Sequence, residues 1–578
     1  MTDRDLFFGT SGPKNADIVL VGESWGSEEE QAQRPFVGQS GKELDRILEE
    51  SRIRSALVFK TNVISAKPNG NETELFFEEN TKGRPKWRGL HPSSFAKTEI
   101  DRLHSQLRVI RPKLVIAHGN YALWALSEGL CSISSIRSKI DGVSRLVPGG
   151  ILSWRGSMLT STDSNSKLLP VIHPAAILRA WYLRAVTVHD LKTRVKQALE
   201  NDWIDKWAPY ILAPPTFEDA IICLEGWLIQ AEIAPVRLVC DIETARGLMT
   251  CIGFGTDRVG LTIPFVRLRP GRQFDSYWRP QEEVHLARLI RRILSHPNIL
   301  IEGQNFLYDT QYIQHYEGVS PRCDFDTMLA HHLLFPGTPK GLDYLSSLYC
   351  RFHRFWKDDN KEWDLNADET QHLRYNAEDL LRTYECATVL RRMIVDLGQK
   401  EQWEWEKKKA ALALRMMNRG IRIDTKRRSQ YGFELSAALS DTQRRLTTII
   451  PNSLTESLVK SSKKPWYSSP KQQQTLFYDR LGLPPQRSRK TGSVTVDDEA
   501  LETLKTKFPE IAPIFDLILI SRSIGVFHNT FVNAELEPDG RMKCSFNPAG
   551  TETFRWSSSQ NAFWRGTNLQ NIPKGDEE

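Results

Sequence analysis

The sequence has few cysteines, no long apolar run and little net charge, and each scarcity excludes a class of protein. Its eight cysteines are scattered over 578 residues without a CxxC pair, which argues against a zinc ribbon or a disulfide framework and fits reduced thiols. No apolar run reaches about 18 residues, so no membrane span is predicted. The first residues, Met1 to Phe7, are charged, unlike a secretory signal. We therefore expect a cytoplasmic protein with no membrane partner.

The net charge of +6 is small, but it is unevenly placed. Residues 401–578 hold 27 Lys and Arg against 21 Asp and Glu, so the whole excess lies there. Within that part, Lys460–Lys490 carries eight basic residues against one acid, Asp479. This stretch is either a solvated loop or an arm that binds phosphates, because Lys and Arg near a duplex add affinity that does not depend on sequence. The length predicts three or four domains.

Three short carboxylate motifs say most about chemistry. They are Asp241-Ile-Glu243, Asn305-Phe-Leu-Tyr-Asp309 and Tyr375-Asn-Ala-Glu-Asp379. Residues two apart on a strand point the same way, and residues four apart on a helix share a face. Four carboxylates brought to one point could hold two divalent metals and cleave a phosphodiester. Each motif alone is also compatible with ordinary surface carboxylates.

In order and residue type, these motifs resemble the 3′–5′ proofreading exonuclease of family A DNA polymerases, the DEDD class with a tyrosine in the third motif. The stretches Leu248–Gly255 and Val259–Phe265 are predicted strands that would begin a ribonuclease H-like sheet. The resemblance implies two Mg²⁺ or Mn²⁺ ions and a single-stranded 3′ end as substrate. It also implies four metal ligands, which are Asp241, Glu243, Asp309 and Asp379. Tyr375 would orient the attacking water, and Asn305 would position the strand.

The first 205 residues alternate apolar runs with helical stretches, which predicts an α/β domain with a largely parallel sheet. The predicted strands are Ala16–Gly22, Ala56–Ser65, Leu114–His118 and Leu168–His173. Such sheets place ligands at the carboxyl ends of their strands. Three clusters lie at those ends: Gly22-Glu-Ser-Trp-Gly26 with Arg34-Pro-Phe-Val-Gly-Gln-Ser-Gly41, then Thr61-Asn62, and then His173-Pro-Ala-Ala-Ile-Leu-Arg179.

These clusters resemble the uracil-DNA glycosylase superfamily, most closely its family 4-like members. The resemblance implies that Glu23 activates water, Phe36 stacks on a flipped base, Asn62 reads the base edge and His173 stabilises the leaving oxyanion. Two features depart from the family. Cys131 is the single cysteine of residues 1–205, so no iron–sulfur cluster is expected, and Trp25 stands where proline is usual. An active glycosylase that acts on uracil-containing DNA and a non-catalytic DNA-binding module both stay open.

The last third contains Ser469-Pro-Lys-Gln, Lys490-Thr-Gly-Ser, Ser545-Phe-Asn-Pro-Ala-Gly and Asn568-Leu-Gln-Asn-Ile-Pro573. These segments resemble the thumb and first palm segment of family A DNA polymerases, although Phe554 and Trp556 depart from the family's pattern. The resemblance implies that a basic thumb tip grips the duplex backbone and that three further residues follow the primer and the minor groove. Those residues are, for the thumb tip, Lys463, Lys464, Lys471, Arg487 and Lys490, and, for the primer and groove, Arg555, Gln570 and Asn571.

We therefore predict an α/β multidomain protein. Its parts are a parallel-sheet glycosylase-like domain (1–205), a ribonuclease H-like exonuclease domain (206–400) and a mostly helical thumb with the start of a palm (401–578). The sequence ends at Glu578, before the family's catalytic palm motifs, so polymerisation is expected to need a C-terminal half that is split off or truncated. The order of domains resembles some large bacteriophage polymerases, which would place the protein in a bacterial host cytoplasm on primer–template DNA. A DNA-binding scaffold and a stand-alone repair nuclease are the alternatives.

Overall fold

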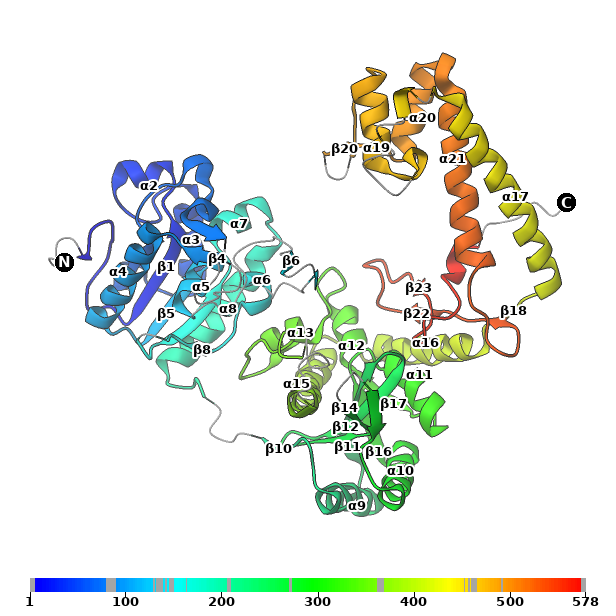
Figure 1. The fold of residues 1–578 in the computed structure, drawn as a ribbon. Helices are drawn as coiled ribbons and strands as arrows, with labels where there is room; N and C mark the ends of the chain where they lie inside the picture. Colours follow the sequence, from blue (N-terminus) through cyan, green and yellow to red (C-terminus); the bar gives the residue numbers. More distant parts are fainter. Residues whose placement is uncertain are drawn as a thin grey trace. The chain divides into compact units, whose positions relative to one another are not determined.

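The computed structural model divides into two compact units, residues 1–407 and 408–578. It describes residues 6–572 apart from 80–89, 128–129, 131–138, 141–142, 145–149, 163, 205–208, 270–272, 361–368, 452, 456–457, 459–464 and 490–491. The first unit contains two sheets and the second is mostly helical (Figure 1). This agrees with the predicted fold class.

The first sheet has five strands in the order β2-β1-β5-β9-β8. Four of them are parallel, and β8 runs antiparallel to β9. The strands are β1 (Ile18–Ser24), β2 (Val58–Ile64), β5 (Leu114–His118), β8 (Leu159–Thr160) and β9 (Lys167–Val171). The four parallel strands lie where the sequence predicted them, within two residues at each end. Short β-ribbons lie outside this sheet: β3 (Phe77–Glu79) with β4 (Leu90–Pro92), and β6 (Lys139–Ile140) with β7 (Val143–Ser144).

Helices cover both faces of this sheet, because its strands are apolar on both sides. Val19 and Val21 point into one core, whereas Ile18 and Leu20 point into the other, as alternation along a strand requires. The first core is closed by α4 (Ser94–Ile110), α5 (Asn120–Leu126) and α6 (Ile151–Trp154). The second is closed by α3 (Gln39–Glu50), α7 (Pro174–Arg179) and α8 (Leu183–Leu199). The short helix α2 (Ser27–Ala32) precedes α3.

The second sheet has six strands in the order β10-β13-β12-β11-β16-β17. β11, β12 and β13 pair antiparallel, and β16 and β17 continue parallel to β11. The strands are β10 (Tyr210–Leu212), β11 (Val236–Ala245), β12 (Leu248–Gly255), β13 (Val259–Pro264), β16 (Ile299–Gly303) and β17 (Cys323–Asp326). The predicted antiparallel start of a ribonuclease H-like sheet is therefore present. A separate ribbon joins β14 (Val266–Arg269) to β15 (Gln273–Ser276).

The long helix α15 (Glu369–Asp396) packs across β11, β12 and β13. Gly253 on β12 makes this approach possible, since a Cβ there would lie 2.1 Å from Asn376 Oδ1 of the helix. The close contact brings the middle of α15 to the carboxyl end of the apolar run in β11. The remaining helices are α9 (Phe217–Ile233), α10 (Pro280–Ser295), α11 (Phe306–Glu317), α12 (Thr327–Leu334), α13 (Leu342–Tyr349) and α16 (Lys400–Arg419).

The second unit is built on two long helices, α17 (Thr425–Ile449) and α21 (Ala512–Phe527), which pack together. Its core also includes Phe477 and Leu501. Shorter elements complete it: α19 (Pro470–Gln474), α20 (Asp498–Lys507), and the ribbons β18 (Ile421–Arg422) with β21 (Arg541–Met542), β19 (Gln486–Arg487) with β20 (Val494–Thr495) and β22 (Ser545–Asn547) with β23 (Ser557–Ser559). This matches the predicted helical character.

One helical stretch of the second unit, Pro509–Val532, is long and apolar enough to cross a membrane by length and composition, with a mean hydropathy of 1.5. Asp516 and Arg522 lie within this stretch, so its apolar residues do not form one uninterrupted run. Phe515 and Ile518 of this stretch are buried in the core of the unit. A single helix of this kind is weak support for a span, and the absence of a membrane partner stays a prediction.

Candidate active sites

Three predicted metal ligands meet where α15 crosses β11. Oxygen atoms of Asp241, Glu243 and Asp379 all lie within 4.8 Å of one another. Asp241 and Glu243 share a face of β11, as their spacing predicted. The fourth carboxylate, Asp309 on α11, is buried beside the same strand, where its Oδ1 accepts a hydrogen bond of 3.0 Å from the Ile242 N–H. The structure thus gathers all four carboxylates from three elements.

Burial and mutual repulsion disfavour the ionised forms of these carboxylates. Burial and the charges of Asp309, Asp379 and Glu243 raise the pKa of Asp241 well above its usual value. Burial, followed by the charge of Asp379, raises the pKa of Glu243 to about 8. Burial likewise raises the pKa of Asp309 to about 8. Crowded carboxylates with raised pKa values are relieved by cations, and their oxygen atoms are the ligands that Mg²⁺ and Mn²⁺ prefer. The donor set therefore fits divalent metals.

A lysine that the sequence analysis missed enters this cluster. The Lys357 ammonium forms an ion pair with Asp379 Oδ2 and donates a hydrogen bond of 2.9 Å to the Tyr375 hydroxyl oxygen. Beside it, Trp356 Nε1 donates to the other oxygen, Asp379 Oδ1, at 2.6 Å. Burial lowers the pKa of Lys357, but the charge of Asp379 offsets this and the pKa is raised overall. Both residues lie in an irregular segment, so no periodicity signalled them.

Tyr375 and Asp379 share one face of α15, as predicted, and Lys357 links them. Burial and the charge of Asp379 raise the pKa of Tyr375 above its usual value, so its hydroxyl stays protonated at neutral pH. Asn376, inside the same motif, was also missed. Its Nδ2 donates 2.7 Å to Asp241 Oδ2, while its Oδ1 accepts 2.9 Å from the Thr262 hydroxyl. This amide therefore ties α15 to β11 and orients Asp241.

The prediction that Asn305 and Asp309 share a helix face was wrong. Helix α11 begins at Phe306, and Asn305 is its N-cap in a left-handed conformation with φ of 56°. Asparagine tolerates this conformation. Its backbone N–H donates 3.2 Å to Asp326 Oδ1. Asn305 thus sits outside the helix, at the turn between β16 and α11.

The four predicted glycosylase residues lie at the carboxyl ends of β1, β2 and β9. Phe36 stands at φ of 56°, with its ring stacked on that of His173 at a centroid distance of 6.1 Å. A Cβ on Gly22 would lie 2.8 Å from both Phe36 Cζ and Asn62 Oδ1, so the glycine lets these two side chains meet. The Glu23 carboxylate accepts a hydrogen bond of 3.3 Å from the Tyr121 N–H.

Two uncharged polar groups, an amide and an imidazole, lie in this region. Asn62 is 2% exposed, and its Oδ1 has no hydrogen-bond partner within the part of the chain that the structure describes. His173 is the N-cap of α7, and its Nδ1 accepts from the Ala175 N–H at 3.2 Å. Burial and the charge of Arg179 lower the pKa of His173 to about 4. A neutral ring with Nδ1 as acceptor carries its proton on Nε2, which is a donor.

His118, which the sequence analysis did not single out, packs against the Phe36 ring. Its centroid lies 5.9 Å from that of Phe36. Burial, followed by the charge of His173, lowers the pKa of His118 to about 3. Trp25, which replaces the family's usual proline, is buried against Phe8 with ring centroids 6.0 Å apart. Cys131 lies outside the described residues.

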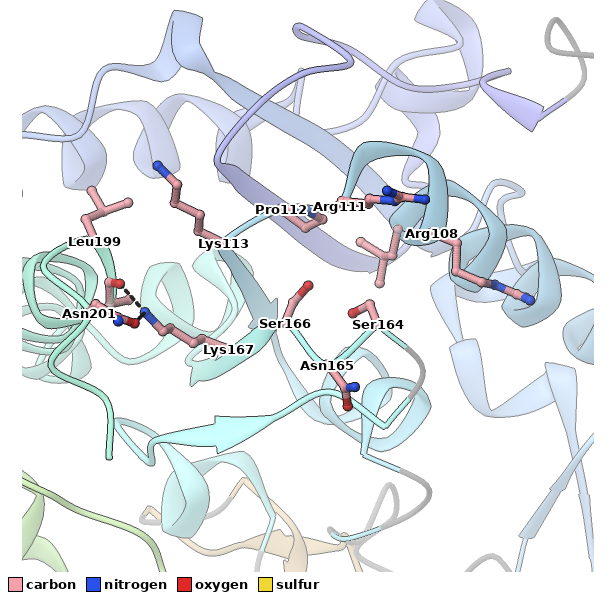
Figure 2. Close-up of a pocket in the computed structure, with 12 residues that line it drawn as sticks. Arg108, Arg111, Pro112, Lys113, Ser164, Asn165, Ser166, Lys167, Leu199 and Asn201 are labelled. Carbon is pink, nitrogen blue, oxygen red and sulfur yellow. Dashed lines mark hydrogen bonds between the residues drawn. The ribbon is translucent and has the colours of Figure 1, made fainter. Parts of the chain in front are cut away.

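A basic hollow of about 700 Å³ lies at the other end of the strands of the five-stranded sheet (Figure 2). Its lining includes Arg108 and Arg111 at the end of α4, and Lys113 and Lys167 at the amino-terminal ends of β5 and β9. Lys167 donates 2.9 Å to Asn201 Oδ1, and Lys113 pairs with Asp17 at 3.0 Å. The length of the strands separates this hollow from Glu23 and Asn62, which lie at the carboxyl ends.

The predicted DNA-contacting residues of the second unit are exposed where they are described. Lys471 lies on α19 and Arg487 on β19, and the Arg487 Nη1 donates 2.9 Å to the Gly492 carbonyl. Gln570 Nε2 donates 3.0 Å to the Trp556 carbonyl. Arg555 and Asn571 are also exposed. The remaining three lie outside the described residues: Lys463, Lys464 and Lys490.

Comparison with known families identifies three modules in order along the chain. The uracil DNA glycosylase superfamily matches residues 8–200, a 3′–5′ exonuclease family matches 275–395, and DNA polymerase family A matches 437–578. Asp309, Tyr375 and Asp379 fall inside the exonuclease match, whereas Asp241 and Glu243 precede it.

The chain is 30% identical over 186 residues to a type-4 uracil-DNA glycosylase of Thermotoga maritima, which covers 31% of this chain and 78% of that protein. It is 28% identical over 185 residues to a type-4 enzyme of Archaeoglobus fulgidus, covering 31% and 76%. It is 30% identical over 259 residues to DNA polymerase I of Geobacillus stearothermophilus, covering 43% of this chain and 27% of that protein. The chain thus spans about a quarter of the polymerase relative. It belongs to the uracil DNA glycosylase superfamily through its N-terminal domain, and it is a family A DNA polymerase-like protein in which a 3′–5′ exonuclease module and part of a polymerase module follow that domain.

Proposed function

We propose that the protein is a divalent-metal-dependent 3′–5′ exonuclease that removes nucleotides from single-stranded 3′ ends of DNA. The meeting of Asp241, Glu243 and Asp379 within 4.8 Å carries this proposal, and the match to the 3′–5′ exonuclease family supports it. Two Mg²⁺ or Mn²⁺ ions held by these carboxylates and Asp309 would supply Lewis-acid activation of water and stabilise the charge on the leaving oxygen.

The protein's own side chains position the reacting groups. Lys357 donates to the Tyr375 oxygen, so the Tyr375 hydroxyl proton is left to bind the attacking water or a phosphate oxygen. Asn376 and Trp356 each hold one oxygen of a carboxylate, which fixes how Asp241 and Asp379 face the substrate. Such fixed geometry lowers the barrier because little reorganisation is left for the reaction itself.

Degradation of a 3′-labelled single strand with Mg²⁺ tests this proposal. The wild-type chain should give a ladder of shortened products, and the double variant Asp241→Ala, Glu243→Ala should not. Asp257→Ala removes an exposed carboxylate from the β12–β13 turn and is the matched control that should keep activity. A ladder that persists in the double variant would contradict the proposal.

We further propose that the N-terminal domain excises uracil from DNA. The buried Asn62 amide, which faces Phe36 across Gly22, carries this second function. In this proposal Phe36 stacks on a flipped base, Asn62 reads its edge, Glu23 activates water and His173 Nε2 donates to the leaving oxygen. Alkali-labile breaks at a single uracil test it, with Glu23→Gln as the inactive variant. Binding of uracil DNA without breaks would instead favour a non-catalytic DNA-binding module.

For the second unit we propose that it binds primer–template DNA. Exposed Lys471 and Arg487 would contact backbone phosphates, Arg555 would contact the primer, and Gln570 and Asn571 would lie along the minor groove. As a partner of this unit in synthesis we propose a polypeptide that supplies the further carboxylate set for two metals that nucleotidyl transfer needs. Primer extension by this chain alone is the test, and robust synthesis would overturn the proposal. A bacterial cytoplasmic setting also stays a proposal.

A further inference from the structure

A short segment after α13, residues 353–357, contacts both the glycosylase-like domain and the exonuclease carboxylates. Phe355 is 3% exposed and is part of the core of the glycosylase-like domain, although it lies in the exonuclease part of the sequence. Its ring packs edge-on against Trp154 of α6, with centroids 5.1 Å apart. The chain therefore returns about 150 residues after the end of the first domain and inserts one aromatic side chain into that domain's core.

Hydrogen bonds donated by two backbone N–H groups fix the same segment to the first domain. The Phe355 N–H donates 3.1 Å to the Ser157 hydroxyl. The Met158 N–H donates 2.7 Å to the His353 carbonyl. Ser157 and Met158 connect α6 to β8, so the segment lies along this connection. Buried backbone groups that are paired in this way hold a defined register.

Two buried arginines of the first domain hold the preceding helix. Arg155 pairs with Asp190, both at most 3% exposed, and its Nη1 donates 2.8 Å to the Ser347 hydroxyl on α13. The Arg194 guanidinium donates to the carbonyls of Ser347, Cys350 and Arg351 at 2.7–3.1 Å. Breaking one partner of a buried charged network is strongly destabilising. The contact is therefore a built interface within the first unit.

The residues that follow Phe355 reach the exonuclease carboxylates. Trp356 donates to Asp379 Oδ1, and Lys357 contacts both Asp379 and Tyr375. Consecutive Cα atoms are fixed about 3.8 Å apart. Phe355 is therefore joined to Trp356 and Lys357 by a short stretch of backbone, and we expect a change in the packing of Phe355 to shift both side chains.

We propose that the glycosylase-like domain is a structural part of the exonuclease site, with Phe355 as the positioning residue that couples them. Packed in the first core, Phe355 holds Lys357 and Trp356 against Asp379 and Tyr375. This proposal rests on the proposed exonuclease function. It adds that this function requires the packing of Phe355 in the core of the first domain, outside the six-stranded sheet that carries Asp241 and Glu243.

A double-mutant cycle in the full chain tests the coupling. Phe355→Ala should lower kcat on a 3′-labelled single strand about 10- to 100-fold, the usual penalty for a misplacement near 1 Å, with little change in KM. Lys357→Ala should lower kcat as well. If Phe355 acts through Lys357, adding Phe355→Ala to Lys357→Ala should cause little further loss. Phe355→Leu, which refills the core, should restore most of the rate.

Leu103→Ala is the matched control, because it removes a buried side chain of α4 from the same core and leaves the Trp154–Met158 connection unchanged in sequence. It should lower the melting temperature of the first unit but leave kcat unchanged. If Phe355→Ala fails to fold, Ser157→Ala, which deletes one hydrogen bond to the segment, should lower kcat about threefold.

Wild-type kcat in a folded Phe355→Ala variant, or an equal loss in Leu103→Ala, would overturn the inference. So would fully additive losses in the cycle. Absence of metal-dependent degradation by the wild-type chain would instead contradict the proposed exonuclease, which keeps the two failures distinct.

Discussion

The two candidate sites of the first unit are built on opposite principles. The exonuclease site crowds four carboxylates, and burial with mutual repulsion raises the pKa of Asp241, Glu243 and Asp309. The glycosylase-like site pairs aromatic rings with a neutral histidine and an amide whose oxygen is unpartnered among the described residues. One site therefore stores repulsion that a cation would relieve, and the other offers a hydrogen-bonding group that a base edge would satisfy.

The largest effect should come from neutralising one carboxylate. Glu243→Gln removes a proposed metal ligand and should reduce nuclease turnover about 1,000-fold, equivalent to about 4 kcal/mol of barrier. The same change removes repulsion, so the melting temperature in EDTA should rise. Uracil release should not change. Nuclease kinetics and thermal melts measure both effects, and a lower melting temperature in EDTA would show that the cluster is not strained.

The complementary change in the other site is Asn62→Ala. Loss of the amide proposed to read the base should weaken uracil recognition about 10- to 100-fold, because one good hydrogen-bonding pair contributes about 1–3 kcal/mol. Nuclease activity should stay at the wild-type level. Competition binding with uracil-containing and thymine-containing strands is the measurement. Equal loss of affinity for both strands would mean that Asn62 does not discriminate bases.

Stability of the exonuclease site should depend on pH in the absence of metal. Glu243 and Asp309 have folded-state pKa values of about 8, above their unfolded values near 4. The folded state therefore binds more protons, so stability falls as pH rises from about 4 to about 8 and levels off above, by at most about 1.4 kcal/mol per pH unit for one group. Mg²⁺ should flatten this dependence. Melting temperatures in EDTA that rise over this range would contradict the expectation.

The smallest effect is expected from pH on the glycosylase-like site. The pKa of His173 is lowered to about 4 and that of His118 to about 3, so both rings are neutral throughout pH 6–8. Uracil release or binding should vary less than about twofold across this range, since 2 pH units above the pKa leaves about 1% of the ring charged. A titration near pH 6.5 that vanishes in His173→Gln would show that this histidine is not buried as described.

Local spacing in the sequence was enough to predict part of the exonuclease site. Asp241 and Glu243 lie on one strand face, and Tyr375 and Asp379 on one helix face, because strands and helices impose these periods. Asn305 shows the limit of that argument. Asparagine is common both at helix N-caps and in left-handed conformations, and that preference, rather than i to i+4 spacing, describes where it lies.

Residues brought in from irregular segments could not be predicted in this way. Trp356 and Lys357 have no periodic relation to α15, and their place depends on where Phe355 packs. That packing joins residues about 200 positions apart, Ser157 and Phe355, and no local pattern encodes it. Asn376 lay inside a recognised motif, but its role depends on the close approach that Gly253 allows.

The return of Phe355 to the first core limits how freely these modules could be exchanged by recombination. A crossover within residues 205–208 would join the exonuclease module to a different N-terminal domain. Phe355 would then lack the core in which it packs here. The replacement would need an equivalent socket, with counterparts of Trp154 and Ser157, before the incoming gene product worked. Selection on such chimaeras would therefore act on the pair of domains together, as if they were a single heritable part.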